Sequence, residues 1–291
     1  MQSIAVASGC FEQVSQILFT AITINAINSC CFEQPREASL ALRTALQAVT
    51  CNQGAFHCTP QLRGREPEVS EAAHQPSCST VIKDWSENSR HFIINEKLTG
   101  ETLNIAWSRL SPDQRRRIAK QTADYITELR KLHSPRIQSL TGETVYSTFL
   151  FLAGPTAPHG PFSSDQELWA ELDKALVNVP KKAPQRLQTM MPAATPYTFT
   201  HGDLTNVNIM VDKGNLTGII DWETGGYFPV WWEFTSASVG LGQEDKDWKT
   251  LLQEYMPQFK EANEFWLDFF SLSRYPKLDS RATAFFQKIK E

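Results

Sequence analysis

The chain has 291 residues, of which 41% are hydrophobic and 21% charged, and this composition is typical of globular proteins and excludes fibrous and wholly disordered classes. It carries 28 basic and 32 acidic residues, a net charge of −4, so we expect no nucleic-acid partner. No apolar run approaches the ~20 residues of a membrane span, so we expect a cytoplasmic protein without a membrane partner.

The first 82 residues differ in composition from the rest of the chain. They contain all six cysteines but no Lys, Asp, Trp or Tyr, whereas the remainder holds all eight Trp and all six Tyr. The cysteines lack the close pairs of a zinc module, so we interpret them as reduced thiols. No Lys or Arg precedes Arg36, which argues against a secretory signal. We therefore predict an atypical N-terminal region over residues 1–80, which we expect to pack poorly, and a functional domain over residues 81–291.

Local patterns predict the elements of this domain in chain order. Two strands over residues 81–85 and 91–95 are joined by a polar turn, and a long helix runs from Pro112 to about His133 with Ser111 as its N-cap. The elements that follow are a loop over residues 154–161, a helix near Asp165–Val177, a loop marked by Pro180, Pro184 and Pro192, and helices from Trp231 to the end.

A predicted hairpin carries the first candidate site. The apolar runs 209–211 and 216–220 flank Gly214-Asn215, a pair that suits a two-residue turn. A turn centred there places Asn208 opposite Asp221, with Cβ atoms about 4.5–5.5 Å apart. An amide oxygen and a carboxylate in this arrangement suit magnesium, which takes few protein ligands.

Asp203 lies on the loop that enters this hairpin. A carboxylate at that position can orient a hydroxyl group and accept its proton. The spacing of Asp203 and Asn208 is by itself common by chance, and the joint geometry with the hairpin is what favours a site. His201 nearby is interpreted as a hydrogen-bonded structural histidine rather than a catalyst.

Several motifs resemble the aminoglycoside phosphotransferase family, and within it the fungal phosphotransferase-like proteins, relatives of the protein kinases. The hinge between the two lobes of that family is similar to Phe92-Ile-Ile-Asn-Glu96-x-Leu-x-Gly100-Glu-x-Leu103, with the hinge itself at about residues 96–100. The other motifs are His201-Gly-Asp203-Leu-x-x-x-Asn208-Ile, Gly218-Ile-Ile-Asp221-Trp-Glu, Gly226-Tyr-Phe-Pro229 and Trp232-Glu233.

The resemblance implies an α+β, protein-kinase-like, two-lobed fold with a reduced or irregular N-lobe and a mainly helical C-lobe. It also implies ATP- and Mg²⁺-dependent phosphoryl transfer to a hydroxyl of a small molecule. Asp203 would be the catalytic base, and Asn208 and Asp221 would hold Mg²⁺. The adenine of ATP would meet the backbone at Glu96, Lys97 and Leu98.

The N-terminal region departs from the family pattern. The family uses a strand lysine for the phosphates, paired with a helix glutamate, but no Lys occurs before Lys83 and no Gly-rich loop is present. Glu37 is a candidate for that glutamate, although an ordinary amphipathic helix is favoured there, and Arg36 or Arg43 is a candidate replacement cation. The alternative function is therefore a catalytically inactive kinase-like binding protein.

Two groups of side chains after Asp221 are candidates for contacts with the acceptor. Trp222, Trp231 and Trp232 could stack on a flat substrate, but burial in the core is the commoner fate of such side chains. Scattered acids on the C-terminal helices could line a pocket for a cation but are interpreted as solvated faces. These acids are Glu233, Glu244, Asp245, Asp247, Glu261, Glu264 and Asp268.

Overall fold

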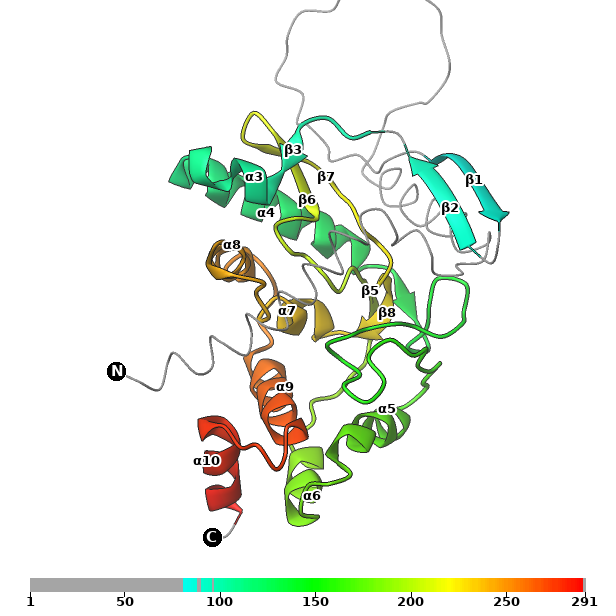
Figure 1. The fold of residues 1–291 in the computed structure, drawn as a ribbon, viewed down its shortest axis with the longest axis vertical. Coiled ribbons are helices and arrows are strands. Elements are labelled where there is room, and N and C mark those ends of the chain that lie inside the picture. Colours follow the sequence, from blue (N-terminus) through cyan, green and yellow to red (C-terminus); the bar gives the residue numbers. More distant parts are fainter. Residues whose placement is uncertain (1–80, 88–89, 96, 290–291) are drawn as a thin grey trace, which may run out of the picture.

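The computed structural model describes residues 81–87, 90–95 and 97–289 (Figure 1). Some sequence predictions concern positions outside these described residues. They are the atypical region 1–80 with its six cysteines, Glu37 as a helix glutamate, Arg36 and Arg43 as replacement cations, and Glu96 at the hinge.

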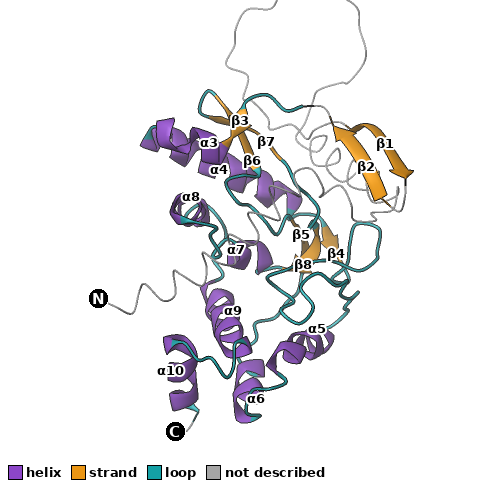
Figure 2. Cartoon of the chain, in the orientation of Figure 1, coloured by secondary structure: helices purple, strands orange, loops and turns teal. Residues whose placement is uncertain are grey.

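In chain order, the described part begins with short strands, mixes helices with strands through its middle and ends in helices, which is an α+β order (Figures 1 and 2). The strands are β1 (Val81–Glu87), β2 (Arg90–Asn95), β3 (Glu101–Thr102), β4 (His133–Ser134), β5 (Tyr197–Thr200), β6 (Ile209–Asp212), β7 (Asn215–Ile219) and β8 (Gly226–Pro229). The helices are α3 (Leu103–Ala106), α4 (Pro112–Leu129), α5 (Asp165–Leu172), α6 (Lys182–Gln188), α7 (Trp232–Ser236), α8 (Gln243–Gln253), α9 (Lys260–Ser273) and α10 (Ser280–Lys288). Two 3₁₀ turns, η1 (Trp107–Arg109) and η2 (Asp173–Leu176), complete the described elements.

The strands form three small antiparallel sheets, ordered β1-β2, β3-β6-β7 and β4-β5-β8. The predicted hairpin over residues 81–95 is confirmed, and so are the helices that follow Trp231. The sequence analysis did not predict β5 or β8. The residues of β5, Tyr-Thr-Phe-Thr, alternate apolar and polar side chains, but the run is only four residues long and all four are buried, so it gives the weakest form of the strand signal.

The long helix α4 forms where its signals predict it. Ser111 accepts a hydrogen bond from Gln114 N at 3.3 Å, and Gln114 Oε1 accepts one from Ser111 N at 2.8 Å, which makes a capping box before Pro112 at the first position. The helix ends at Leu129, about one turn before the predicted end at His133.

The predicted loop around three prolines is wrong at Pro184. This residue is buried in the first turn of α6. The first four N–H groups of a helix have no intrahelical partner, so a proline there loses no hydrogen bond. Pro180 and Pro192 lie outside α6, as predicted.

Two apolar clusters form the described core. One packs α4 and α8 against the sheet of β6 and β7, with Ile126, Leu216 and Trp248 among its members. The other packs α5, α6 and α9 around Trp231 and Phe265. Among the described helices, none combines the length and the apolar character that a bilayer span requires.

Candidate active site

The loop between β5 and β6 is anchored by a buried glutamate. Glu233 on α7 is fully buried, and its carboxylate accepts hydrogen bonds from His201 N at 2.6 Å and Gly202 N at 3.0 Å. Both N–H groups belong to the first two residues after β5. The side chain of Glu233 on α7 therefore fixes the position of the first two residues of the loop.

Gly202 occupies a conformation that other residues rarely adopt. Its φ is +82°, and a Cβ atom built there would lie 3.3 Å from Thr224 Oγ1. That hydroxyl donates a 2.7 Å hydrogen bond to His201 O, so it has little freedom to move away. Glycine is required because both the backbone angle and the close neighbour disfavour a side chain.

His201 has the structural role that the sequence analysis favoured. Its Nε2 donates to Ile220 O at 2.9 Å, and its Nδ1 accepts from Asp203 N at 3.1 Å, so the ring is neutral. Burial lowers its pKa, against the opposing effect of the Asp203 charge. The imidazole links the loop to the end of the hairpin.

Asp203 and Asn208 are held together at the two ends of one loop. Asn208 Nδ2 donates to Asp203 O at 3.0 Å and to Asp203 Oδ2 at 3.1 Å. These bonds occupy the amide nitrogen of Asn208 and one carboxylate oxygen of Asp203. Within the described part of the chain, no hydrogen bond engages the remaining oxygen of either side chain, and both are available to other partners.

The predicted register of the hairpin is wrong by one residue. The turn is formed by Lys213 and Gly214, which have φ values of 50° and 76°, and not by Gly214 and Asn215. A bulge between Met210 and Val211 shifts the pairing again. As a result, Asn208 O accepts a hydrogen bond from Ile220 N at 2.9 Å, so Asn208 does not lie directly opposite Asp221.

Asp221 comes next along the chain and has a φ of 64°, in the left-handed region that Asp tolerates better than most residues. Partial burial and then the charge of Asp203 raise its pKa to about 6. Burial, followed by the charges of Asp221 and Asp203, raises the pKa of Glu223 to about 7. Both residues are exposed to solvent, which weakens the burial contribution and leaves repulsion among the three carboxylates as the firmer cause.

The oxygen donors of this cluster fit magnesium. Asn208 offers its amide oxygen, since its nitrogen is already bound to Asp203, and Asp221 offers a carboxylate that a neighbouring negative charge destabilises. Magnesium is usually bound by one or two carboxylates together with water and phosphate oxygens. In the described residues, no three His, Cys, Asp or Glu side chains could hold a metal together.

The hinge residues are placed only in part. Lys97 is exposed and Leu98 is buried, while Glu96 lies outside the described residues. Gly100 ends the segment with a φ of +93°, and a Cβ atom there would lie 2.1 Å from Val211 O. The hinge therefore packs directly against the hairpin that follows the loop.

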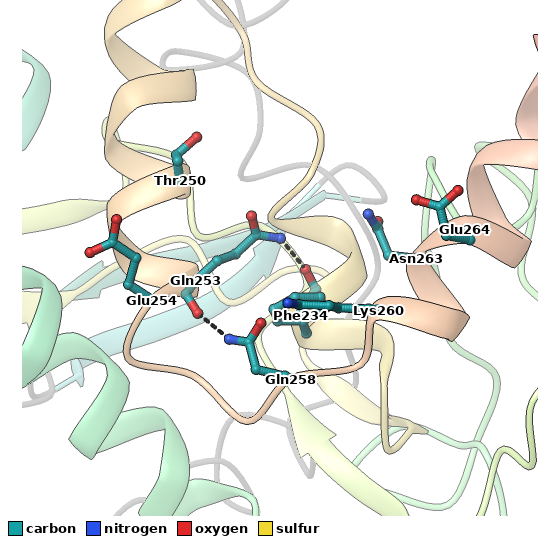
Figure 3. A pocket seen from close by; sticks show the side chains of 8 residues that line it. All are labelled: Phe234, Thr250, Gln253, Glu254, Gln258, Lys260, Asn263 and Glu264. Atoms are coloured by element: carbon teal, nitrogen blue, oxygen red, sulfur yellow. Dashed lines mark hydrogen bonds between the residues drawn. The ribbon is translucent and has the colours of Figure 1, made fainter.

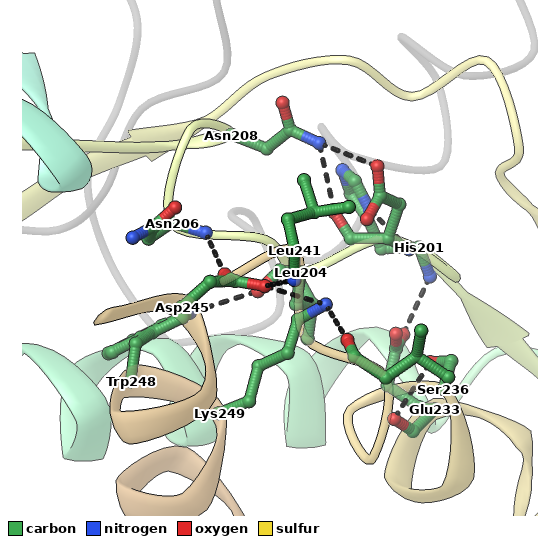
Figure 4. A network of polar contacts seen from close by, with 12 residues as sticks. His201, Leu204, Asn206, Asn208, Glu233, Ser236, Leu241, Asp245, Trp248 and Lys249 are labelled. Atoms are coloured by element: carbon green, nitrogen blue, oxygen red, sulfur yellow. Dashed lines mark hydrogen bonds and ion pairs between the residues drawn. The ribbon is translucent and has the colours of Figure 1, made fainter. Parts of the chain in front are cut away.

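The interpretation of the C-terminal acids as solvated is wrong for Glu233 and Asp245, which are 0% and 3% exposed. Asp245 accepts a hydrogen bond from Asn206 N at 2.8 Å, in the middle of the loop (Figure 4). A sequence signal existed for Glu233, since it is a lone acid between Trp232 and Phe234 in an apolar run. Glu244, Asp247, Glu261 and Glu264 are exposed as predicted, whereas Asp268 is mostly buried and forms a 2.6 Å ion pair with Arg281.

Two surface hollows are lined by residues outside this loop. One of about 330 Å³ lies between α8 and α9 and is lined by side chains such as Gln253, Gln258 and Lys260 (Figure 3). Another of about 420 Å³ lies between Gly100 and the tip of the hairpin at Lys213. The side chains of Trp231 and Trp232 line neither hollow and are buried in the core, as the sequence analysis favoured, whereas Trp222 is only partly buried and stacks on Phe199.

Solved structures similar to the chain include a ternary complex of the aminoglycoside phosphotransferase APH(2")-IIa with streptomycin and ATP, at 12% identity and a TM-score of 0.45, covering 88% of this chain and 82% of that one. Aminoglycoside phosphotransferase APH(4)-Ia is similar at 13% identity and a TM-score of 0.47, covering 75% and 74%. No curated protein matches.

A sequence profile described as the phosphotransferase enzyme family matches residues 56–264, more than two thirds of the chain. The match confirms the resemblance to aminoglycoside phosphotransferases and, with the α+β order of the elements, the predicted kinase-like fold class. The loop of Asp203 and Asn208, the hairpin and Asp221 all lie inside the matched span, and the chain belongs to the phosphotransferase enzyme family.

Proposed function

We propose that the protein transfers the γ-phosphoryl group of ATP to a hydroxyl group of a small molecule, with Mg²⁺. The observation that carries this proposal is the loop in which Asn208 holds one carboxylate oxygen of Asp203 and leaves the other free. Membership in the phosphotransferase family supports the reaction class. Catalysis of this kind depends mainly on positioning and electrostatics, and a loop fixed at several backbone groups supplies the positioning.

In the proposed reaction, Asp203 orients the acceptor hydroxyl and accepts its proton. The acceptor oxygen forms a bond to the γ-phosphorus, and the bond from that phosphorus to the bridging oxygen of ADP breaks. ADP leaves with the bonding electron pair, and the proton remains on Asp203 until solvent removes it. Asn208 restrains the carboxylate throughout, because its amide nitrogen binds both Asp203 O and Oδ2.

Asn208 and Asp221 would hold the magnesium ion, which supplies charge neutralisation to the phosphates when it is bound. Replacing Asp221 with Asn tests this assignment, because the change is nearly isosteric and removes one negative charge. We expect the variant to fold normally but to lose the rise in melting temperature that Mg-ATP gives the unchanged protein.

Asp212→Asn is the matched control. Asn208 directly precedes β6, whereas Asp212 lies at the far end of that strand, beside the turn. The Asp212→Asn variant should melt with the same Mg-ATP shift as the unchanged protein. An undiminished shift in Asp221→Asn would remove Asp221 from the metal site. Mg-GTP in parallel samples shows which nucleotide the protein prefers.

The second candidate function is a kinase-like binding protein without activity, favoured by the absence of any lysine before Lys83. A phosphate-binding lysine makes a charge contact with the nucleotide in this class of enzyme. A protein that shows a Mg-ATP melting shift but transfers no phosphate to any hydroxyl compound would support this second function.

A further inference from the structure

One face of α8 contacts the loop that carries Asp203 and Asn208. Asp245, Trp248 and Lys249 are spaced three and four residues apart, so their side chains share a face of the helix. All three are at most 4% exposed. Figure 4 shows the three side chains gathered next to Leu204 and Asn206 of the loop.

Two of these side chains bind backbone groups inside the loop. Asp245 Oδ1 accepts a hydrogen bond from Asn206 N at 2.8 Å, and Trp248 Nε1 donates to Leu204 O at 2.9 Å. Both groups lie between Asp203 and Asn208 in the chain. The path that connects these two residues is therefore fixed by α8, in addition to the anchor at Glu233.

The charge of Asp245 is balanced inside the protein. Its Oδ2 accepts a hydrogen bond from Leu241 N at 2.9 Å and lies 3.3 Å from Lys249 Nζ. Lys249 also donates to Val239 O at 2.5 Å. Burying charged groups costs more than burying apolar ones of similar size, so a pair of this kind adds little to stability by itself. Its hydrogen bonds specify one arrangement of the loop.

The same stretch of the loop is held from its other side. Asn206 O accepts a hydrogen bond from Asn104 N at 3.1 Å, and Asn208 N donates to Thr205 O at 2.9 Å. The peptide groups at Asn206 therefore have partners in both directions. A change at Asp245 would free one of them and alter the distance between Asp203 and Asn208.

We propose that Asp245 is a positioning residue for phosphoryl transfer, with Lys249 as the cation that holds its carboxylate in place. Asp245 acts through the Asn206 peptide and touches neither substrate nor metal. This inference rests on the proposed function for its consequence in catalysis, while its structural part, the control of the loop by α8, can be measured separately.

Hydrogen exchange of backbone amides measures the structural part. In Asp245→Asn the single amide oxygen can accept from Asn206 N or from Leu241 N but not from both. We expect the amides of residues 204–208 to exchange about tenfold faster, with unchanged exchange in α4 and α9. Asp247→Asn, on the exposed side of α8, is the matched control and should leave the loop unchanged.

Steady-state kinetics measures the catalytic part. We expect Asp245→Asn to lower kcat by about 10–100-fold, because small displacements of reacting groups have effects of this size. The KM for ATP should stay within about threefold, since the loss falls on the transition state. Lys249→Arg should retain most of the activity and Lys249→Met should not.

Two results would overturn the inference: unchanged exchange of residues 204–208 in Asp245→Asn, or faster exchange spread evenly over the protein. If Asp245→Asn does not fold, the double variant Asp245→Asn/Lys249→Met, which buries no unpaired ammonium, takes its place in both measurements. If the unchanged protein transfers no phosphate, the proposed function fails, and the exchange comparison still decides whether α8 positions the loop.

Discussion

The free carboxylate oxygen of Asp203 is the group on which the proposed chemistry depends. We expect Asp203→Ala to lower the rate of phosphoryl transfer by about 10²–10⁴-fold, the range typical of a positioned proton acceptor. Affinity for Mg-ATP should change by no more than a few fold, because Asp203 acts on the acceptor. Transfer assays and calorimetric titration with Mg-ATP measure the two effects.

The backbone contact of Asn208 should keep the loop in place in the Asp203→Ala variant. In Asp203→Ala the Asn208 amide nitrogen still donates to the backbone oxygen of residue 203, so the loop keeps one of its two restraints. A parallel loss of nucleotide affinity and rate would mean that Asp203 supports the metal site rather than the acceptor.

Glu233 should make the stability of the protein depend on pH. Burial raises its pKa to about 7, although the Gly202 and His201 N–H groups and the charge of Arg130 act in the opposite direction. The folded protein therefore holds a proton on Glu233 at pH values where the unfolded chain, with the ordinary value of 4.5, has lost it. Its contribution to stability is fully present below pH 4.5 and is lost as the pH rises through 7.

We expect Glu233→Gln to flatten this part of the stability profile between pH 4.5 and 7. Urea unfolding at a series of pH values measures the effect. Glutamine keeps one oxygen for the two N–H groups, so the variant should also be less stable overall. An unchanged slope in the variant would show that other groups cause the pH dependence.

At the level of elements, the turn residues predicted that β6 and β7 form a hairpin but did not predict its register. Gly214-Asn215 and Lys213-Gly214 are both acceptable to a turn that needs positive φ values. A Cβ atom at Gly214 would lie 2.6 Å from Gln114 Nε2 at the start of α4. That contact joins segments 100 residues apart and favours the observed register, and no local pattern reports it.

Alanine substitutions at Gly100, where the hinge packs against β6, and at Gly142 form a matched pair. Both have φ near +90°, but only Gly100 has a backbone atom in the space of a Cβ, Val211 O at 2.1 Å. We expect Gly142→Ala to cost about 1–2 kcal/mol from backbone strain alone. Gly100→Ala should cost about 2–5 kcal/mol, because overpacking against β6 is added.

Chemical denaturation of the two variants measures the difference. The pairing of β3 with β6 should be lost first in Gly100→Ala, since Glu101 and Val211 are partners in that ladder. Equal losses of stability in the two variants would show that the hinge can move away from β6 without cost.

At the level of the whole molecule, the sequence predicted features whose interacting residues are close together in the chain and missed features whose interacting residues are far apart in it. The helix α4 was predicted because its cap, first proline and apolar stripe all lie within the helix or next to it. The roles of Glu233 and Asp245 were missed because each binds loop residues more than 30 positions away. The apolar neighbours of Glu233 indicate that it is buried, but no local pattern in the sequence identifies the loop residues that Glu233 and Asp245 bind.

Nucleotide binding also depends on the whole molecule, because the negative charge of the proposed site must be compensated. Burial and then the repulsion among Asp203, Asp221 and Glu223 raise the pKa values of Asp221 and Glu223, and ATP would bring further negative charge to this cluster. The first 82 residues contribute four arginines and no lysine that could offset it. In the proposed site, we expect a divalent cation held by Asn208 and Asp221 to supply most of the compensating positive charge.

We expect binding of ATP to depend entirely on the metal. Mg-ATP should raise the melting temperature at pH 8, where the carboxylates are ionised, and ATP with EDTA should leave it unchanged. Adenosine, which carries no phosphate, is the control and should give a small shift that is the same with and without Mg²⁺. A full shift with ATP in EDTA would contradict this prediction and would mean that a protein cation, with Arg36 and Arg43 as the first candidates for substitution, neutralises the phosphates in place of the metal.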